Sequence, residues 1–258
     1  MRFTQAIVRT PGACFANGLT TAAALGAPVL TKARAQHLAY VEALCSCGLH
    51  VTTLEPDEAY PDSTFVEDTA VIAERVAVAT RPGAPTRAGE VLSIVTALRA
   101  LGREPVPIQS PGTVDGGDIC QADDHFLIGM SARTNEHGAR QLADILRNHG
   151  YQASLIDVRT VPGLLHLKSG ISYLGNGQMI VATGVPRAGA LARFERVEVD
   201  AGESYAANCI RVNDRVLIAS GFPRTAALLA ARGIATISLE LSEFQKMDGG
   251  LSCLSLRF

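Results

Sequence analysis

A strand–strand–helix–strand unit recurs along this chain of 258 residues and constrains its fold more than any other feature. Each unit begins with two apolar runs joined by a polar or glycine-rich turn, which predicts a β-hairpin. A helical run that stops at a glycine follows, and a short strand-like run completes the unit. The expected hairpins turn at Glu74-Arg75, Asp123-Asp124, Gly175-Asn176-Gly177 and Asn213-Asp214. A period of about 40 to 50 residues is typical of an array or a propeller.

Four helices are expected from apolar residues spaced three and four apart. They cover residues 31–47, 88–101, 135–149 and 225–232. In the first helix, Leu38, Val41 and Cys45 share one face. Between residues 169 and 200 the helix is short or missing, so the repeat is weakest there.

The C-terminal run from Cys253 to Phe258 is interpreted as the first strand of a fifth unit. Residues 6–9, the first helix and residues 51–54 would complete that unit. Because the last strand then completes the first unit, we expect a ring closed by pairing of the N- and C-terminal segments, without a free sheet edge. The predicted fold class is α/β, a propeller of five pseudo-symmetric units that forms a single domain over residues 1–258.

Composition excludes several classes of partner. The net charge of −2 provides no field that would attract nucleic acid or a membrane surface, so the expected partner is a small molecule. Neither a signal peptide nor a membrane-spanning stretch is recognisable, which predicts a cytoplasmic protein. The six cysteines are too sparse for a disulfide scaffold, and no zinc-binding spacing is present. The sequence is compatible with a homodimer but does not fix the oligomeric state.

Chemistry-bearing residues stand just before each predicted first strand. In a radial array, the starts of corresponding strands converge on one end of the axis. The residues that would meet there are Glu67-Asp68, Asp115-Gly116-Gly117-Asp118, His166-Leu167-Lys168-Ser169, Asn208 and Cys253. A cysteine nucleophile needs an adjacent base and a group that orients that base. We therefore expect Cys253 to act with His166 and Asp115, against the alternative that Cys253 is a small buried residue.

An excess of carboxylates predicts a cationic ligand. The acids expected to face one cavity are Asp62, Glu67, Asp68, Asp115, Asp118 and Asp248. Without a metal motif, the cation that separates them is expected to be the substrate, and a planar guanidinium matches paired carboxylates. Arg87 and Arg133 lie in corresponding loops and could bind a ligand carboxylate. The alternatives are solvated loop charges for any single acid and a helix-bracing role for Arg133.

Seven motifs in order resemble the guanidine-modifying superfamily, and specifically the dimethylarginine dimethylaminohydrolases. They are Phe65-Val66-Glu67-Asp68, Thr80-Arg81-Pro82-Gly83-Ala84, Asp115-Gly116-Gly117-Asp118, Ser131-Ala132-Arg133-Thr134-Asn135, Leu165-His166-Leu167-Lys168, Ala206-Ala207-Asn208-Cys209 and Asp248-Gly249-Gly250-Leu251-Ser252-Cys253. The resemblance covers essentially the whole chain. It implies a pentameric α/β propeller that needs no cofactor and no metal.

The same resemblance assigns roles to individual residues. It implies Cys253 as nucleophile, His166 as acid and base, and Asp115 as the group that orients His166. The substrate-binding residues that it implies are Glu67 and Asp68 for the guanidinium, Asp62 and the backbone near Leu19 for the α-amino group, and Arg87 with Arg133 for the α-carboxylate. Asp248 is expected at the guanidinium edge, and residues 12–21 are expected to act as a lid.

The expected reaction is hydrolysis of an Nω-methylated arginine to citrulline and an alkylamine through a covalent thiouronium at Cys253. Arginine or agmatine deiminase activity is an alternative within the superfamily. A non-enzymatic propeller that serves as a binding module is an alternative from another class, and it would have no use for Cys253, His166 and Asp115 together. Zinc bound at Cys253 as an inhibitor is left open.

Overall fold

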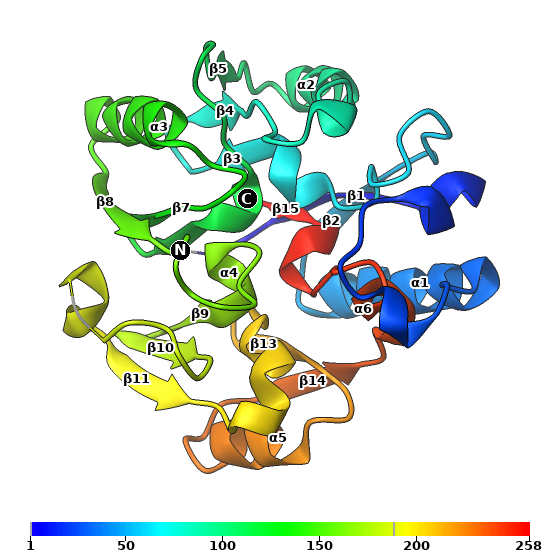
Figure 1. Cartoon of the computed structure of the whole chain (residues 1–258), viewed down its shortest axis with the longest axis vertical. Helices are drawn as coiled ribbons and strands as arrows, with labels where there is room; N and C mark the ends of the chain where they lie inside the picture. The colour runs from blue at the N-terminus through cyan, green and yellow to red at the C-terminus, as the bar shows by residue number, and fades with distance from the viewer. Residues whose placement is uncertain (1, 188) are drawn as a thin grey trace. The chain divides into compact units, whose positions relative to one another are not determined.

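The computed structural model describes residues 2–187 and 189–258. The chain forms two compact units, one made of residues 1–66 and 209–258 and the other of residues 67–208. Within the described residues the strands form five sheets of three strands each (Figure 1). The chain is therefore an α/β protein, as the sequence predicts.

All five sheets share one pattern. The middle strand pairs antiparallel with one neighbour and parallel with the other. In four sheets the antiparallel pair is a hairpin, and in the fifth the antiparallel partner comes from the C-terminal end of the chain. This is the strand–strand–helix–strand unit expected from the sequence. The polar hairpin turns are confirmed too, and their residues Asp123, Asn176 and Asn213 adopt positive φ, a conformation that Asn and Asp tolerate well.

The unit of residues 67–208 holds three sheets. Their strands are β3 (Ala70–Ile72), β4 (Ala77–Ala79), β5 (Val106–Pro107), β6 (Ile119–Ala122), β7 (His125–Met130), β8 (Gln152–Asp157), β9 (Ile171–Gly175), β10 (Gln178–Val181) and β11 (Glu195–Glu198). The helices α2 (Glu90–Ala100) and α3 (Glu136–Asn148) make the first two crossovers. In the third, a 3₁₀ turn over Gly189–Arg193 stands where a helix would be. The repeat is therefore weakest where the sequence predicted.

The unit of residues 1–66 and 209–258 holds the other two sheets. Their strands are β1 (Gln5–Arg9), β2 (His50–Leu54), β12 (Ile210–Val212), β13 (Arg215–Ala219), β14 (Thr236–Leu239) and β15 (Leu256–Arg257). The helices are α1 (Leu30–Ser46), α5 (Pro223–Ala230) and α6 (Ser242–Gln245). Strand β15 pairs antiparallel with β1, and Thr4 N–H donates to the Phe258 carbonyl at 2.9 Å (Figure 1). The predicted pairing of the terminal segments is confirmed.

Each first strand is preceded by a short helical turn, which the sequence reasoning missed. These turns are Val66–Thr69, Gly116–Asp118, α4 (Leu167–Gly170), Ala201–Ala207 and Ser252–Leu254. The expectation that Cys253 opens a strand is therefore wrong, because Cys253 lies in the last of these turns and β15 begins three residues later. Glycines and small polar residues just before the strands allow the chain to coil once before it extends.

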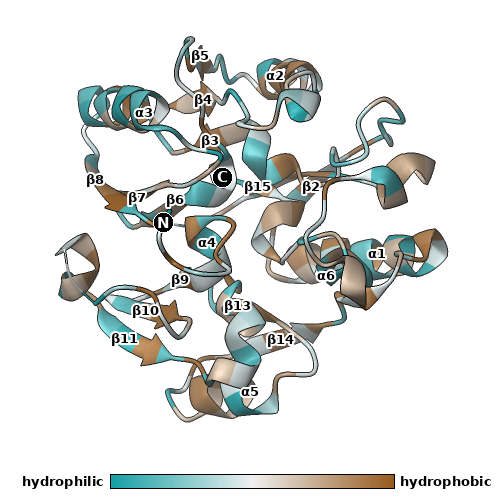
Figure 2. Ribbon diagram, in the orientation of Figure 1, coloured by the Kyte–Doolittle hydropathy of each residue, from teal (hydrophilic) through white to brown (hydrophobic). Residues whose placement is uncertain are grey.

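The first helix buries a different face from the one expected from Leu38, Val41 and Cys45. Leu38 is 58% exposed, whereas His37 and Tyr40 are buried. Tyr40 Oη lies 2.6 Å from Ser255 Oγ, so a polar contact makes its burial acceptable. By contrast, α3 buries the expected Ala139, Leu142 and Leu146, and Figure 2 shows it with both teal and brown residues. No helix in the described part of the chain combines the length and apolarity needed to cross a membrane.

Candidate active site

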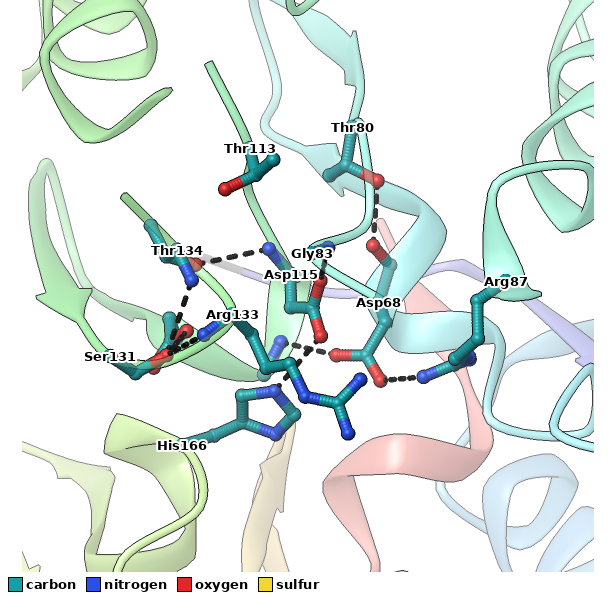
Figure 3. Close-up of polar contacts among 12 residues, drawn as sticks. Asp68, Thr80, Gly83, Arg87, Thr113, Asp115, Ser131, Arg133, Thr134 and His166 are labelled. Carbon is teal, nitrogen blue, oxygen red and sulfur yellow. Dashed lines mark hydrogen bonds and ion pairs between the residues drawn. The ribbon is translucent and has the colours of Figure 1, made fainter. Parts of the chain in front are cut away.

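In the unit of residues 67–208, Asp68, Asp115 and His166 come together in the interior. All three are buried, and one side-chain ligand atom from each lies within 4.8 Å of the others. The His166 Nε2 atom is 3.1 Å from Asp115 Oδ2 (Figure 3). The structure thus forms the His166–Asp115 contact that the sequence predicts. Only a neutral imidazole binds a metal ion, so His166 would have to be deprotonated before Asp68, Asp115 and His166 could bind one.

Asp115 is fixed at both its backbone and its side chain. Its backbone N–H donates to Thr134 Oγ1 at 3.0 Å, and its Oδ1 accepts the Gly83 N–H at 2.7 Å. Its other oxygen is therefore directed to His166 (Figure 3). A carboxylate held in this way selects which imidazole nitrogen carries the hydrogen and leaves Nδ1 for chemistry.

Asp68 is held by two donors on its two oxygens. Gly117 N–H donates to Oδ1 at 2.8 Å, and Arg87 donates from Nη1 to Oδ2. Burial opposes ionisation, but the Arg87 and His166 charges outweigh it and lower the pKa of Asp68 to about 2. Gly117 has no room for a side chain, because a Cβ there would lie 2.7 Å from His166 Nδ1. Glycine at 117 thus allows the imidazole and the Asp68 carboxylate to approach the same backbone segment.

The Arg87 side chain is buried between the carboxylates of Asp68 and Glu90. Its guanidinium donates to Glu90 through Nε at 3.0 and 3.1 Å and through Nη2 at 2.7 Å, and it also pairs with Asp68. Burial alone would lower the pKa of Arg87, but the two acids raise it well above its usual value. Glu90 begins α2, so the arrangement ties that helix to the Asp68 carboxylate through one side chain.

The acids around His166 favour its protonated form. Burial by itself lowers the pKa of His166, but Asp68, Asp115 and Asp118 raise it to about 9. Asp118 has no exposed surface, and its Oδ1 accepts the Leu167 N–H at 2.9 Å while its Oδ2 accepts the Ser131 hydroxyl at 2.6 Å. Desolvation raises the pKa of Asp118. The histidine is thus embedded among acids and poised to donate a proton.

Glu67 and Arg133 complete this part of the site. Lys168 Nζ donates to Glu67 Oε1 at 2.5 Å, and both side chains are largely buried. Arg133 is half-buried in the turn after β7, and its backbone N–H donates to Ser131 Oγ at 3.0 Å. A Cβ at Gly83 would lie 2.2 Å from the Arg133 carbonyl oxygen, so glycine allows the turn before Arg87 to pack on the turn that carries Arg133.

Cys253 lies in the other unit, half-buried in the 3₁₀ turn Ser252–Leu254. The Gly250 N–H points at Cys253 Sγ at 3.4 Å. The neighbouring Gly249 has a packing role, since a Cβ there would lie 2.3 Å from the Phe65 ring. Phe65 packs in turn against Phe15 and Phe244.

Three carboxylates in the same unit hold the backbone of residues 12–21. Glu58 accepts from Ala13 and Cys14 at 2.8 and 2.9 Å. Asp62 accepts the Leu19 N–H at 3.0 Å, and Asp248 accepts the Thr21 N–H at 2.5 Å. Asp62 and Leu19 are therefore in direct contact, and Asp248 touches the same loop. Residues 12–21, which the resemblance implies as a lid, are thus held by acids, two of which were predicted to bind substrate.

Glu90 was missed as a functional candidate, and it pairs with the predicted site residue Arg87. Lys168 and Asp118 stood in the segments expected to converge but were given no role of their own. Lys168 pairs with Glu67, and Asp118 contacts the residue after His166. Only the spacing of Asp118 from Asp115 carried a signal, because both flank the same glycine pair.

Together with the comparisons that follow, the fold and site define a class of protein: a hydrolase that acts on C–N bonds of guanidino compounds. An arginine deiminase family model matches residues 98–222. A dimethylarginine dimethylaminohydrolase from Pseudomonas aeruginosa is 44% identical over 99% of this chain and 100% of its own. The chain belongs to the dimethylarginine dimethylaminohydrolase family.

Solved structures agree with this family. A cysteine-to-serine variant of the P. aeruginosa enzyme in complex with citrulline has a TM-score of 0.95 and 43% identity, with full coverage of both chains. An adduct of a histidine-to-glycine variant of dimethylarginine dimethylaminohydrolase with S-methyl-L-thiocitrulline has a TM-score of 0.94 and 43% identity, covering 99% of this chain and 100% of the other.

Proposed function

We propose that this protein hydrolyses asymmetric dimethylarginine and monomethylarginine to L-citrulline and dimethylamine or methylamine. The observation that carries the proposal is the buried His166 imidazolium paired with Asp115 among acids, in a chain 44% identical to a dimethylarginine dimethylaminohydrolase over its whole length. A site with more carboxylates than cations suits a guanidinium substrate. The citrulline complex of the P. aeruginosa enzyme supports citrulline as the product.

The proposed reaction has two stages. The Cys253 thiolate forms a C–S bond with the guanidinium carbon, and His166 gives its proton to the departing alkylamine as the C–N bond breaks. Neutral His166 then takes a proton from water, whose oxygen adds to the thiouronium carbon. Cleavage of the C–S bond, with loss of the added hydroxyl's proton to the released amine, gives neutral citrulline and regenerates the thiolate. Asp115 stabilises each imidazolium that forms.

The substrate-binding roles are also proposals. Glu67 and Asp68 would orient the guanidinium, with Asp248 at its edge, and fixed carboxylates lower the barrier because they need no reorganisation. Asp62 and the backbone of Leu19 would bind the α-amino group. Arg133 and Arg87 would bind the α-carboxylate. The contacts of Arg87 with Asp68 and Glu90 add a structural role to the one expected from the sequence.

The wider architecture follows the same family. We propose that the five repeated sheets close into a pentameric α/β propeller as a single domain over residues 1–258. The terminal pairing of β15 with β1 supports closure. The cytoplasmic location and the homodimer stay predictions from the sequence.

Arginine deiminase activity is the second candidate, because the arginine deiminase family model matches part of the chain. A panel of asymmetric dimethylarginine, monomethylarginine, arginine and agmatine separates the two, with citrulline and the released amine measured for each substrate. We expect the methylated substrates to be preferred. Turnover confined to arginine or agmatine would refute the proposed function.

A further inference from the structure

A lysine lies beside the predicted guanidinium-binding residue. Lys168 is the second residue of α4, directly after Leu167, so one short helix follows His166 and carries this cation. Its Nζ donates to Glu67 Oε1 at 2.5 Å, with the two side chains 14% and 5% exposed. The proposed substrate is itself a cation. It is therefore unexpected that Lys168 already pairs with the buried Glu67 carboxylate.

We propose that Lys168 determines specificity, favouring Nω-methylated arginine over arginine by occupying hydrogen-bond capacity on Glu67. The inference rests on the proposed function, since it assigns Glu67 to the guanidinium. An arginine guanidinium carries five N–H donors. Asymmetric dimethylation removes two of these donors, and monomethylation removes one. A site that discriminates in favour of the methylated substrates should therefore present fewer acceptors.

Asp68 meets the same requirement by other means. Its Oδ1 accepts the Gly117 N–H and its Oδ2 accepts from Arg87. Both carboxylates expected at the guanidinium thus already receive protein donors before any substrate binds. The extra N–H groups of arginine would be desolvated without a full set of acceptors, and an unpaired buried donor is costly. A methylated substrate lacks those donors, so its binding carries a smaller desolvation cost.

The position of Lys168 is fixed by neighbouring contacts. Asn208 Nδ2 donates to the Lys168 carbonyl at 3.0 Å, and the Ser169 N–H donates to the His166 carbonyl at 3.0 Å. These hydrogen bonds fix the backbone before and after the Cα of Lys168. The position from which the Lys168 side chain extends to Glu67 is therefore fixed.

The test is a comparison of kcat/KM for asymmetric dimethylarginine and arginine in the wild type and in Lys168→Met, which keeps the apolar stem and removes the donor. We expect the ratio of kcat/KM for asymmetric dimethylarginine to that for arginine to fall at least about tenfold. Without Lys168, Glu67 can accept the additional N–H donors of arginine, so kcat/KM for arginine rises more. The change in net charge acts on both cationic substrates alike and cancels in the ratio. Arg99→Met, which removes the exposed Arg99–Glu104 ion pair, is the matched control and should leave the ratio unchanged.

Lys168→Gln keeps a donor without the charge and guards against misfolding of the Met variant. A retained ratio in Lys168→Gln with a collapsed ratio in Lys168→Met supports donor occupancy. Equal losses on both substrates in both variants, or a ratio within twofold of the wild type in Lys168→Met, overturn the inference. Failure of the wild type to hydrolyse any methylated arginine would instead refute the proposed function, and the inference with it.

Discussion

Asp118 accepts the backbone N–H of Leu167 at 2.9 Å, so a fully buried carboxylate fixes the residue directly after His166. It also contributes to the raised pKa of His166. One side chain therefore restrains the position of the histidine and favours its charge. Gly129 makes room for this contact, since a Cβ there would lie 2.7 Å from Leu167 Cβ and 3.0 Å from Asp118 Oδ1.

We expect Asp118→Asn to move the basic limb of the pH–kcat profile to lower pH. The amide can still accept from Leu167, but loss of the negative charge lowers the pKa of His166 from about 9 toward its usual value. Asp118→Ala should lose both effects and reduce kcat by roughly 10²-fold or more. An unshifted profile in Asp118→Asn, with reduced kcat, would show a purely structural role.

Arg87 should contribute to stability independently of any contact with substrate. Arg87→Met leaves the Asp68 and Glu90 carboxylates buried without their shared cation, which costs about 3–5 kcal/mol of unfolding free energy. Urea denaturation without substrate measures the loss, and Arg75→Met, which removes an exposed pair with Asp124, serves as control. Equal stability of Arg87→Met and the wild type would contradict the stabilising role assigned to the ion pairs of Arg87 with Asp68 and Glu90.

Gly117→Ala should impair catalysis more than folding. The added methyl group would meet His166 Nδ1 at 2.7 Å and Asp68 Oδ1 at 2.9 Å, so these two side chains must move apart. We expect kcat to fall at least about tenfold, because misplacement of reacting groups by a fraction of an ångström is costly. The control is Gly202→Ala, whose Cβ would meet only Asp200 Oδ1 at 3.3 Å. Normal kcat in Gly117→Ala would show that the imidazole tolerates displacement.

The sequence predicted the repeat because turns and helix ends depend on local residues. Polar hairpin pairs and glycines at helix ends need no tertiary information, so the turn between β6 and β7 and the bounds of α3 were located within two residues. The buried face of α1 was not predicted, because Tyr40 is buried through a contact with Ser255, which lies far away in the sequence. The pairings Arg87–Glu90 and Lys168–Glu67 were not predicted for a related reason. Sequence reasoning assigned Arg87 and Glu67 to the ligand, whereas the fold pairs them with Glu90 and Lys168.

His37 should make the protein sensitive to mild acid. It is 3% exposed, its Nε2 has no hydrogen-bond partner among the described residues, and burial lowers its pKa to about 4. Below pH 6.5 the unfolded chain takes up a proton that the folded chain refuses, so stability falls between pH 6.5 and 4, by up to roughly 3 kcal/mol. His37→Leu should flatten this part of a plot of unfolding free energy against pH. An equally steep fall in the variant would place the acid sensitivity elsewhere.

The most direct test of the central claim is the turnover of asymmetric dimethylarginine by the wild type and by Cys253→Ser, with rapid acid quench and peptide mass mapping. We expect the wild type to release citrulline and dimethylamine in equal amounts and to carry a transient adduct on the peptide that contains Cys253. The Cys253→Ser variant should bind the substrate without turnover. Undiminished citrulline release by Cys253→Ser would contradict nucleophilic catalysis by Cys253.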